Sequence, residues 1–327
     1  MAAGRLVPLL SLLVVGCGRC TGSSPTLPDG AVTVARDGGV PGRSEAATGL
    51  SIAPRARGLV RFIVGGDSRD DSAHVIPWAF AEAKARGAAV FLFLGDMELT
   101  PEIDKTFARE LALLDPIPFY PVLGNHEVEQ MGFLAIDKRV AERTLARRFL
   151  GTPRTPVRSA LGDRIVYSVD LPGGVHFIAL DNVTQNGFGH DQLEWLATDL
   201  GRARADGATK HILVGMHKPL AHNGVATHGM DHDGPVATAD SEAALALFVK
   251  EHVDMILASH VHQFTQFQQA GIPSYITGGL GAPLRRSGPE HAFHHFLQLD
   301  IDDAAIHVEV VRFGGTPAIE HQDDEDD

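Results

Sequence analysis

The sequence has little cysteine, few basic residues and few long apolar runs. Its only two cysteines, Cys17 and Cys20, lie near the N-terminus, which excludes a disulfide framework or a cysteine-based zinc site in the rest of the chain. After the N-terminal region, no apolar run approaches the roughly 20 residues that a membrane-spanning helix needs. Lys and Arg number 28 against 41 Asp and Glu, for a formal net charge of -13. We therefore expect no nucleic-acid binding and no non-specific attraction to anionic lipid.

Histidine, by contrast, is abundant. The chain has 17 His but only 3 Tyr and 2 Trp. Imidazole is the commonest side-chain ligand for transition metals, so this surplus is a first indication of a metal site. The 327 residues, 44% of them hydrophobic, suffice for one large α/β domain or two small ones.

The first 17 residues have the pattern of an export signal. Arg5 precedes an apolar run, residues 6–15, that is too short to span a bilayer but fits a signal-peptide core. Residues 14–17 (Val-Val-Gly-Cys) resemble a bacterial lipobox, in which the cysteine is acylated after cleavage; the alternative is a plain signal peptide that happens to contain a cysteine. We predict an exported lipoprotein, held by its N-terminal lipid anchor on the periplasmic or outer side of a bacterial membrane.

Two further segments have compositions that do not favour a packed core. Residues 18–57 are rich in Gly, Ser, Pro, Ala and Thr without apolar periodicity, which predicts a flexible tether. Residues 314–327 end in a run of acidic side chains, which predicts a solvated, disordered tail. Residues 58–313 contain no linker and are expected to form one folded domain.

Strands and helices alternate in this domain. Apolar strands are expected at about 59–64, 89–94, 119–123, 211–215 and 255–258, with helices at about 75–86 and 102–114. This alternation favours βαβ units, a parallel sheet and an α/β fold. Two hairpins are also predicted, one from 165–169 and 175–180 and one from 293–299 and 305–311.

Polar side chains of a few types follow all five of these strands. They are Asp67, Asp96, Asn125 with His126, His217, and His260 with His262. Taken singly, an Asp after a strand is usually a turn or helix-cap residue, and a His there is more often packed or hydrogen-bonded than a ligand. In open α/β sheets, however, ligands bind at the carboxyl ends of the strands. The repetition after five strands therefore indicates one common site.

These residues resemble the sequence blocks of the calcineurin-like metallophosphoesterase superfamily, including its purple-acid-phosphatase-like branches. The resemblance covers most of 58–285, and its blocks are Gly95-Asp96, Gly124-Asn125-His126-Glu127, Gly215-Met216-His217 and Ser259-His260-Val261-His262. It implies a four-layer α/β/β/α sandwich of two mixed β-sheets, with metal ions at the strand ends. The family usually has Gly where this chain has Ser259, and we expect that change to be minor.

The same resemblance implies a dinuclear, metal-dependent phosphoesterase, either a phosphatase or a phosphodiesterase. Asp96 would bridge two metal ions, Asp67 and His262 would complete one position, and Asn125, His217 and His260 the other. This mixed nitrogen and oxygen shell suits Zn, Fe, Mn or Co better than Mg or Ca. The metal pair would hold a bridging hydroxide as the nucleophile that attacks a phosphate-ester substrate. His126 would not be a ligand, but would stabilise the transition state or protonate the leaving oxygen.

The first block departs from the family pattern. It is normally Asp-x-His, but here it is Asp67-Ser68-Arg69. Purple acid phosphatases lack that histidine too and use a Tyr three residues after the bridging Asp, where this chain has Leu99. Glu98, Asp70 and Asp71 are alternative ligands. Arg69 would either bind the substrate phosphate through its forked donors or form an ordinary surface salt bridge.

This departure supports an alternative hypothesis, a degenerate member that binds a metal or a phosphorylated ligand without turnover. The retained His126 argues against it, because a pure binding module does not need that residue. Oligomeric state and the kind of phosphate ester stay open.

Two other groups of residues lie near these blocks. His222, His228 and His232 follow His217 in a glycine-rich loop, and exposed loop histidines are favoured there over a role at the mouth of the site. Residues 278–281 (Gly-Gly-Leu-Gly) resemble a glycine turn near the site in relatives; the alternative is a tight turn that needs positive φ.

Overall fold

The computed structural model describes residues 58–97, 107–129, 138–150, 156–224, 228–285 and 288–314. The predicted export signal and tether, Glu98 and Leu99, and residues 315–327 of the predicted acidic tail lie outside the described residues. Within these ranges, no helix is both long enough and apolar enough to cross a membrane.

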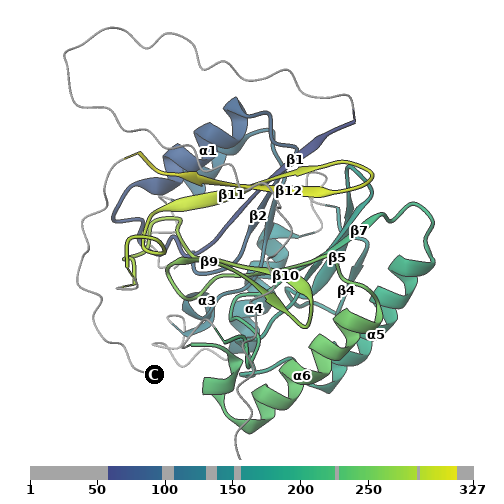
Figure 1. Ribbon diagram of the computed structural model, residues 1–327. Helices are drawn as coiled ribbons and strands as arrows, with labels where there is room; N and C mark the ends of the chain where they lie inside the picture. The colour runs from purple at the N-terminus through teal and green to yellow at the C-terminus, as the bar shows by residue number, and fades with distance from the viewer. Residues whose placement is uncertain are drawn as a thin grey trace, which may run out of the picture. The chain divides into compact units, whose positions relative to one another are not determined.

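The first sheet combines three parallel strands with a C-terminal hairpin (Figure 1). Its order is β12 (Ile306–Arg312), β11 (His295–Ile301), β1 (Val60–Gly65), β2 (Val90–Phe93) and β3 (Phe119–Pro121). Strands β1, β2 and β3 run parallel, and β11 pairs antiparallel with β1. Helix α1 (Val75–Ala85) connects β1 to β2 and packs Phe80 edge-on against Phe91, with ring centroids 5.2 Å apart. The carboxyl ends of β1, β2 and β3 therefore lie along one edge.

The second sheet is larger and is also mixed. Its order is β4 (Ser159–Ala160), β5 (Tyr167–Leu171), β6 (Val175–Ala179), β7 (His211–Gly215), β8 (Met255–Ala258), β10 (Ile272–Thr277) and β9 (Phe264–Gln269). Strands β6, β7, β8 and β10 run parallel, and the outer strands on both sides pair antiparallel. Helices α5 (His190–Ala205) and α6 (Pro235–Lys250) lie side by side in Figure 1.

Strand β6 shows why the layers stack in this way. Side chains alternate across a strand, so Phe177 and Ala179 enter the core that contains the first sheet, while Ile178 enters a second core. Helix α5 covers that second core with Leu196 and Leu200, which are four residues apart and therefore share one face of the helix. Helix, sheet, sheet and helix thus form the expected α/β/β/α sandwich.

The structure confirms the five predicted strands and both predicted hairpins, with end shifts of a few residues. Helix α3 (Asn125–Glu129), which follows β3, was not predicted. Of the helix expected at about 102–114, residues 107–111 are helical, residues 112–114 form a 3₁₀ turn, and residues 102–106 lie outside the described ranges. Helix α4 (Lys138–Phe149), helix α6 and the β9–β10 hairpin were not predicted.

Candidate metal centre

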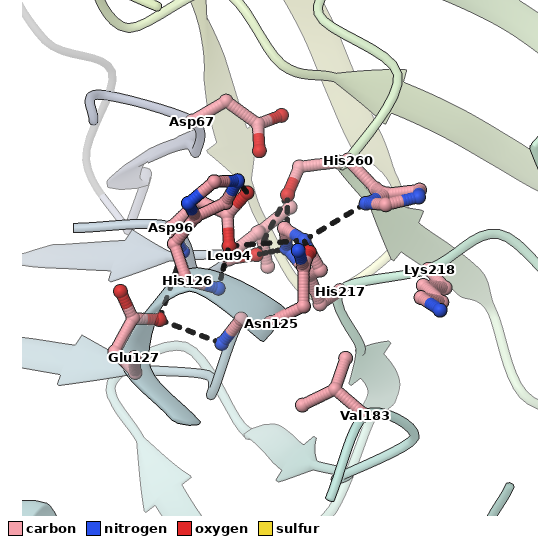
Figure 2. Close-up of polar contacts among 12 residues, drawn as sticks. Asp67, Leu94, Asp96, Asn125, His126, Glu127, Val183, His217, Lys218 and His260 are labelled. Atoms are coloured by element: carbon pink, nitrogen blue, oxygen red, sulfur yellow. Dashed lines mark hydrogen bonds and ion pairs between the residues drawn. The ribbon is translucent and has the colours of Figure 1, made fainter. Parts of the chain in front are cut away.

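The carboxyl ends of strands from both sheets bring the predicted site residues together. Asp67 and Asp96 follow β1 and β2, α3 begins at Asn125 directly after β3, and three histidines follow β7 and β8. Figure 2 shows Asp96, Asn125, His217 and His260 around a common centre, with Asp67 to one side. We call this set the strand-end cluster: Asp67, Asp96, Asn125, His217, His260 and His262.

Asp96 lies at the centre of the strand-end cluster. Potential ligand atoms within 4.8 Å of one another come from two overlapping groups, Asp96 with His217 and His260, and Asp96 with Asp67 and His262. His217 Nε2 lies 3.2 Å from Asp96 Oδ1, 2.9 Å from Asn125 Oδ1 and 3.2 Å from His260 Nδ1. A single carboxylate is thus shared by two groups whose members come from different sheets.

Asp67 is a buried carboxyl group without a hydrogen-bond partner in the described ranges. Its side chain is fully buried, and neither oxygen accepts a hydrogen bond of normal geometry from the described part of the chain. Burial raises the pKa of this carboxyl well above its usual range, although the charge of His217 acts in the opposite direction. A buried carboxylate in this state is strongly unfavourable unless a cation balances it.

Residue 278 leaves room for that carboxylate. A Cβ atom on Gly278 would overlap Asp67 Oδ2, so only glycine fits there without a shift. The predicted need for positive φ holds at Gly281, where φ is 132°, but Gly278 is required by close approach instead. The glycine at 278 therefore lets the backbone approach the Asp67 carboxylate closely.

Backbone carbonyls orient two of the histidine rings. His217 Nδ1 lies 2.9 Å from Leu94 O, and His262 Nδ1 lies 2.8 Å from Pro283 O. A carbonyl oxygen can only accept, so Nδ1 carries a proton in both rings and Nε2 is the atom that remains for a ligand. Histidines that bind metals generally use this arrangement.

The charges in the cluster are arranged around one ion pair. Burial alone would lower the pKa of His217, but the Asp96 carboxylate outweighs burial and raises it to about 9. Burial likewise disfavours the Asp96 carboxylate, yet the charge and hydrogen bond of His217 hold its pKa below the usual range. Burial lowers the pKa of His260 well below its usual value and that of His262 to about 4. His260 and His262 are thus held neutral, the form that binds metals.

His126 and Arg69 lie at the margin of the strand-end cluster. The backbone N–H of His126 donates to Asp96 Oδ1 at 3.1 Å, while its Nε2 is 3.9 Å from Asp96 Oδ2 and its side chain is 15% exposed. His126 belongs to neither ligand group. Arg69 is half-buried, and its positive charge adds to the effect of burial in lowering the pKa of His262. Both side chains are therefore near the cluster without being part of it.

Asp70 and Asp71, two of the alternative ligands for the incomplete first block, accept hydrogen bonds from backbone N–H groups instead. Both oxygens of Asp71 accept backbone N–H groups at the start of α1, from Val75 at 2.7 Å and Ile76 at 3.1 Å. Asp70 is exposed and accepts the backbone N–H of Ser72. Neither belongs to a ligand group in the described ranges. Glu98 and Leu99 are outside them.

Glu127 has a role that sequence reasoning missed. Its buried carboxylate accepts backbone N–H groups of Asp96 at 2.9 Å, Met97 at 2.6 Å and Gly124 at 2.7 Å. It thereby ties the segment after β2 to the segment after β3, and burial raises its pKa to about 7. The only signal in the sequence was that Glu127 belongs to the block at residues 124–127. The block does not indicate which groups its carboxylate contacts.

Ser259, which stands where the family usually has Gly, contacts a member of the strand-end cluster. Its side chain is fully buried, and its hydroxyl lies 3.1 Å from His217 Nδ1. A glycine at this position has no side chain and could not make this contact.

The loop histidines contribute no ligand group in the described ranges. The side chains of His222 and His232 are 63% and 55% exposed, and the ring of His228 stacks on His232 with centroids 5.4 Å apart. Lys218, next to His217, forms a two-pronged ion pair with Asp233 at 2.7 and 2.9 Å. This pair fixes the far end of the loop relative to His217.

Curated relatives of the chain are plant purple acid phosphatases. Purple acid phosphatase 22 of Arabidopsis thaliana is 27% identical over 184 residues, 55% of this chain and 39% of the relative. Purple acid phosphatase 21 of the same plant is 26% identical over 240 residues, 70% of this chain and 51% of the relative. The chain thus spans about half or less of the length of the curated relatives it matches.

Solved structures share the fold at low identity. A purple acid phosphatase from yellow lupin (Lupinus luteus) seeds has a TM-score of 0.55 at 14% identity, covering 78% of this chain and 51% of that one. GAP50, the anchor in the inner membrane complex of Plasmodium, has a TM-score of 0.54 at 12% identity, covering 78% and 85%. A dimetal phosphatase from Danio rerio has a TM-score of 0.52 at 14% identity, covering 78% and 96%.

Residues 60–264 match the family model described as calcineurin-like phosphoesterase. This segment begins with β1 and extends past His262, so it contains every member of the strand-end cluster. The chain belongs to the calcineurin-like phosphoesterase family.

Proposed function

We propose that this chain is a phosphatase-type hydrolase that cleaves phosphate esters at a centre for two metal ions. The observation that carries the proposal is the sharing of Asp96 by two ligand groups, one of which contains the unbalanced Asp67 carboxylate. Two cations about 3.5–4 Å apart are a common solution for phosphoester hydrolysis. A carboxylate with two oxygens is suited to serve both.

The ligand assignment follows the two groups. Asp67, Asp96 and His262 would hold one ion, and Asp96, His217 and His260 would hold the other, with Asn125 Oδ1 beside His217 Nε2 as a further candidate ligand. The donors are imidazole nitrogens and carboxylate or amide oxygens, which fit Zn, Fe, Mn or Co. Because described residues supply only three ligands to the first position, it has room for water or substrate.

The bound ions would neutralise the charge of the phosphate ester and activate the attacking water. His126, next to Asn125 and partly exposed, donates a proton to the leaving oxygen. Arg69 contacts the non-bridging phosphate oxygens with its forked guanidinium, the geometry that suits phosphate. Glu127 holds the backbone on either side of these groups in place.

The test is metal content together with turnover. Purified protein is stripped with a chelator, reloaded separately with Zn, Mn, Fe or Co, and assayed on nitrophenyl phosphate and bis(nitrophenyl) phosphate. We expect two bound ions per chain and hydrolysis only after reloading, with the preferred ester showing whether monoesters or diesters are substrates. A chain that binds no metal, or that hydrolyses esters equally well without metal, contradicts the proposal.

A second candidate function is metal-dependent binding without turnover. It is favoured by one observation, the replacement of the first-block histidine by Arg69. Full metal loading without hydrolysis of either ester, combined with tight binding of inorganic phosphate, would select this alternative.

We also propose that the chain is exported and lipid-anchored through Cys17, on the basis of the lipobox pattern at 14–17. Wild-type protein should then fractionate with membranes, whereas Cys17→Ser should be released or remain unprocessed. Identical, soluble behaviour of both forms contradicts the anchor.

A further inference from the structure

Ser259 lies directly after β8, and its hydroxyl contacts both Leu94 and His217. Its side chain is 0% exposed. Its hydroxyl donates to Leu94 O at 2.6 Å and lies 3.1 Å from His217 Nδ1. Figure 2 shows His217 among Leu94, Asn125 and His260.

The protons in this contact can be assigned from chemistry. Leu94 O has only lone pairs, so the single hydroxyl proton of Ser259 goes to it along the shorter contact. His217 Nδ1 then donates its own proton to Leu94 O at 2.9 Å and to Ser259 Oγ at 3.1 Å. The ring is held by two acceptors instead of one, and its Nε2 is directed at Asp96 and His260.

The neighbouring backbone makes room for this hydroxyl. A Cβ atom on Gly66 would lie 2.7 Å from Ser259 Oγ and 2.9 Å from Ser259 Cβ. The φ angle of Gly66 is not in the left-handed region, so space rather than backbone conformation requires glycine here. Gly66 and Ser259 therefore fit each other as a pair.

We propose that Ser259 is a positioning residue for the metal position formed by Asp96, His217 and His260. The inference rests on the proposed metal-dependent function. Ser259 limits the rotation of the His217 ring, so that Nε2 stays in the orientation the ion requires. Outer partners of ligating histidines typically contribute about 10- to 100-fold to metal affinity.

The experiment measures Zn²⁺ affinity at each of the two positions by chelator competition on metal-stripped protein. The variants are Ser259→Ala and Ser259→Gly, the second restoring the usual family residue and guarding against misfolding of the first. The matched control is Ser274→Ala on β10, because Ser274 is also 0% exposed and its hydroxyl also donates to a backbone carbonyl, Ile272 O at 2.9 Å.

We expect both Ser259 variants to bind one of the two ions about 10- to 100-fold more weakly and the other as wild type does. Ser274→Ala should bind both normally. Wild-type affinity at both positions in the Ser259 variants overturns the inference, and so does an equal loss in Ser274→Ala, which would indicate a general packing effect. If wild-type protein binds no Zn²⁺ at all, the proposed function itself fails, and this result is distinct from the other two.

The fit between Gly66 and Ser259 is tested by a double-mutant comparison. Gly66→Ala should lower the melting temperature strongly in wild-type protein and less in the Ser259→Gly background, because two of the three closest atoms then disappear. Equal drops in both backgrounds would show that Gly66 does not serve the serine.

Discussion

Within the described ranges, two groups of acidic and histidine side chains centre on a buried histidine, His176 or His217, and they differ in one respect. The β6 cluster consists of His176, Asp170, Asp199 and Ser168. His176 Nδ1 lies 2.7 Å from Asp170 and its Nε2 lies 2.9 Å from Asp199, which also accepts the Ser168 hydroxyl at 3.0 Å. Burial alone would lower the pKa of His176, but its two carboxylate partners raise it.

In the strand-end cluster, by contrast, the same residue types leave a buried carboxyl group without hydrogen bonds. Neither oxygen of Asp67 has a hydrogen-bond partner in the described ranges, and His217 Nε2 faces three other potential ligand atoms at once. Buried polar groups are normally satisfied. Burial of polar residues therefore does not by itself mark a functional site; an unbalanced set of ligand atoms does.

An Asp→Asn substitution in each cluster should give the largest difference in metal content and activity between the two. Asp96→Asn removes a charge that both metal positions share, so metal content should fall at both. Activity should fall by more than the about 10- to 100-fold cost of losing an outer partner of a ligand. Metal analysis and hydrolysis assays of the purified variant measure both effects.

Asp199→Asn is the matched control in the β6 cluster. It should lower the free energy of unfolding by about 1–3 kcal/mol, because His176 loses the more buried of its two carboxylate partners, while metal content and activity stay unchanged. If Asp96→Asn kept both metals, or if Asp199→Asn lost them, the distinction between the clusters would disappear.

Replacing His126 should separate chemistry from metal binding. His126→Ala should keep its metals and lose about 10²- to 10⁴-fold in kcat, the usual contribution of a general acid or base. The loss should be smaller for nitrophenyl esters, since good leaving groups need little protonation. Loss of metal instead would place His126 among the ligands, and an unchanged kcat on every substrate would remove it from the mechanism.

Replacing Asp71 should affect stability without affecting the metals. Its carboxylate accepts two N–H groups at the start of α1, so Asp71→Ala should lower the free energy of unfolding by about 0.5–2 kcal/mol. Chemical denaturation and metal analysis measure the two quantities. A drop in metal content would mean that Asp71 substitutes for the missing first-block histidine after all.

The smallest expected effect is a pH dependence that arises in the β6 cluster. Because the pKa of His176 is raised in the folded protein, its stabilising contribution is fully present below the unfolded-state value of about 6.5 and is lost as pH rises through the folded value. Denaturation from pH 5 to 9 should show the stability advantage of wild type over His176→Gln shrinking above that point. An advantage that stays constant with pH contradicts a charged His176.

The elements around the strand-end cluster were predictable because each joins a buried apolar strand to a polar residue at its end. In β7 and β8 this pattern gave the bounds residue for residue. Strand β9 was missed because its sequence, FTQFQQ, has no long apolar run and it lies at the edge of its sheet. Helix α4 was missed because seven of its twelve residues are polar or charged.

The convergence of Asp67, Asp96 and the histidines agrees with the sequence-based expectation, although only metal analysis tests their role as ligands. Sequence reasoning named Glu127, Ser259 and Gly278 but did not predict their contacts. Each acts through a contact with a residue at least three positions away, and often more than twenty. Such contacts depend on how the two sheets meet and leave no periodic signal along the chain.

Glu127 has a consequence for how the protein moves. The Glu127 carboxylate accepts hydrogen bonds from the amides of Asp96, Met97 and Gly124. If the segment after β2 or the segment after β3 moves away, the hydrogen bonds of the other segment to this carboxylate are therefore disturbed as well. In hydrogen–deuterium exchange, the three amides should therefore open as one unit and exchange at a common rate, although they come from segments about thirty residues apart.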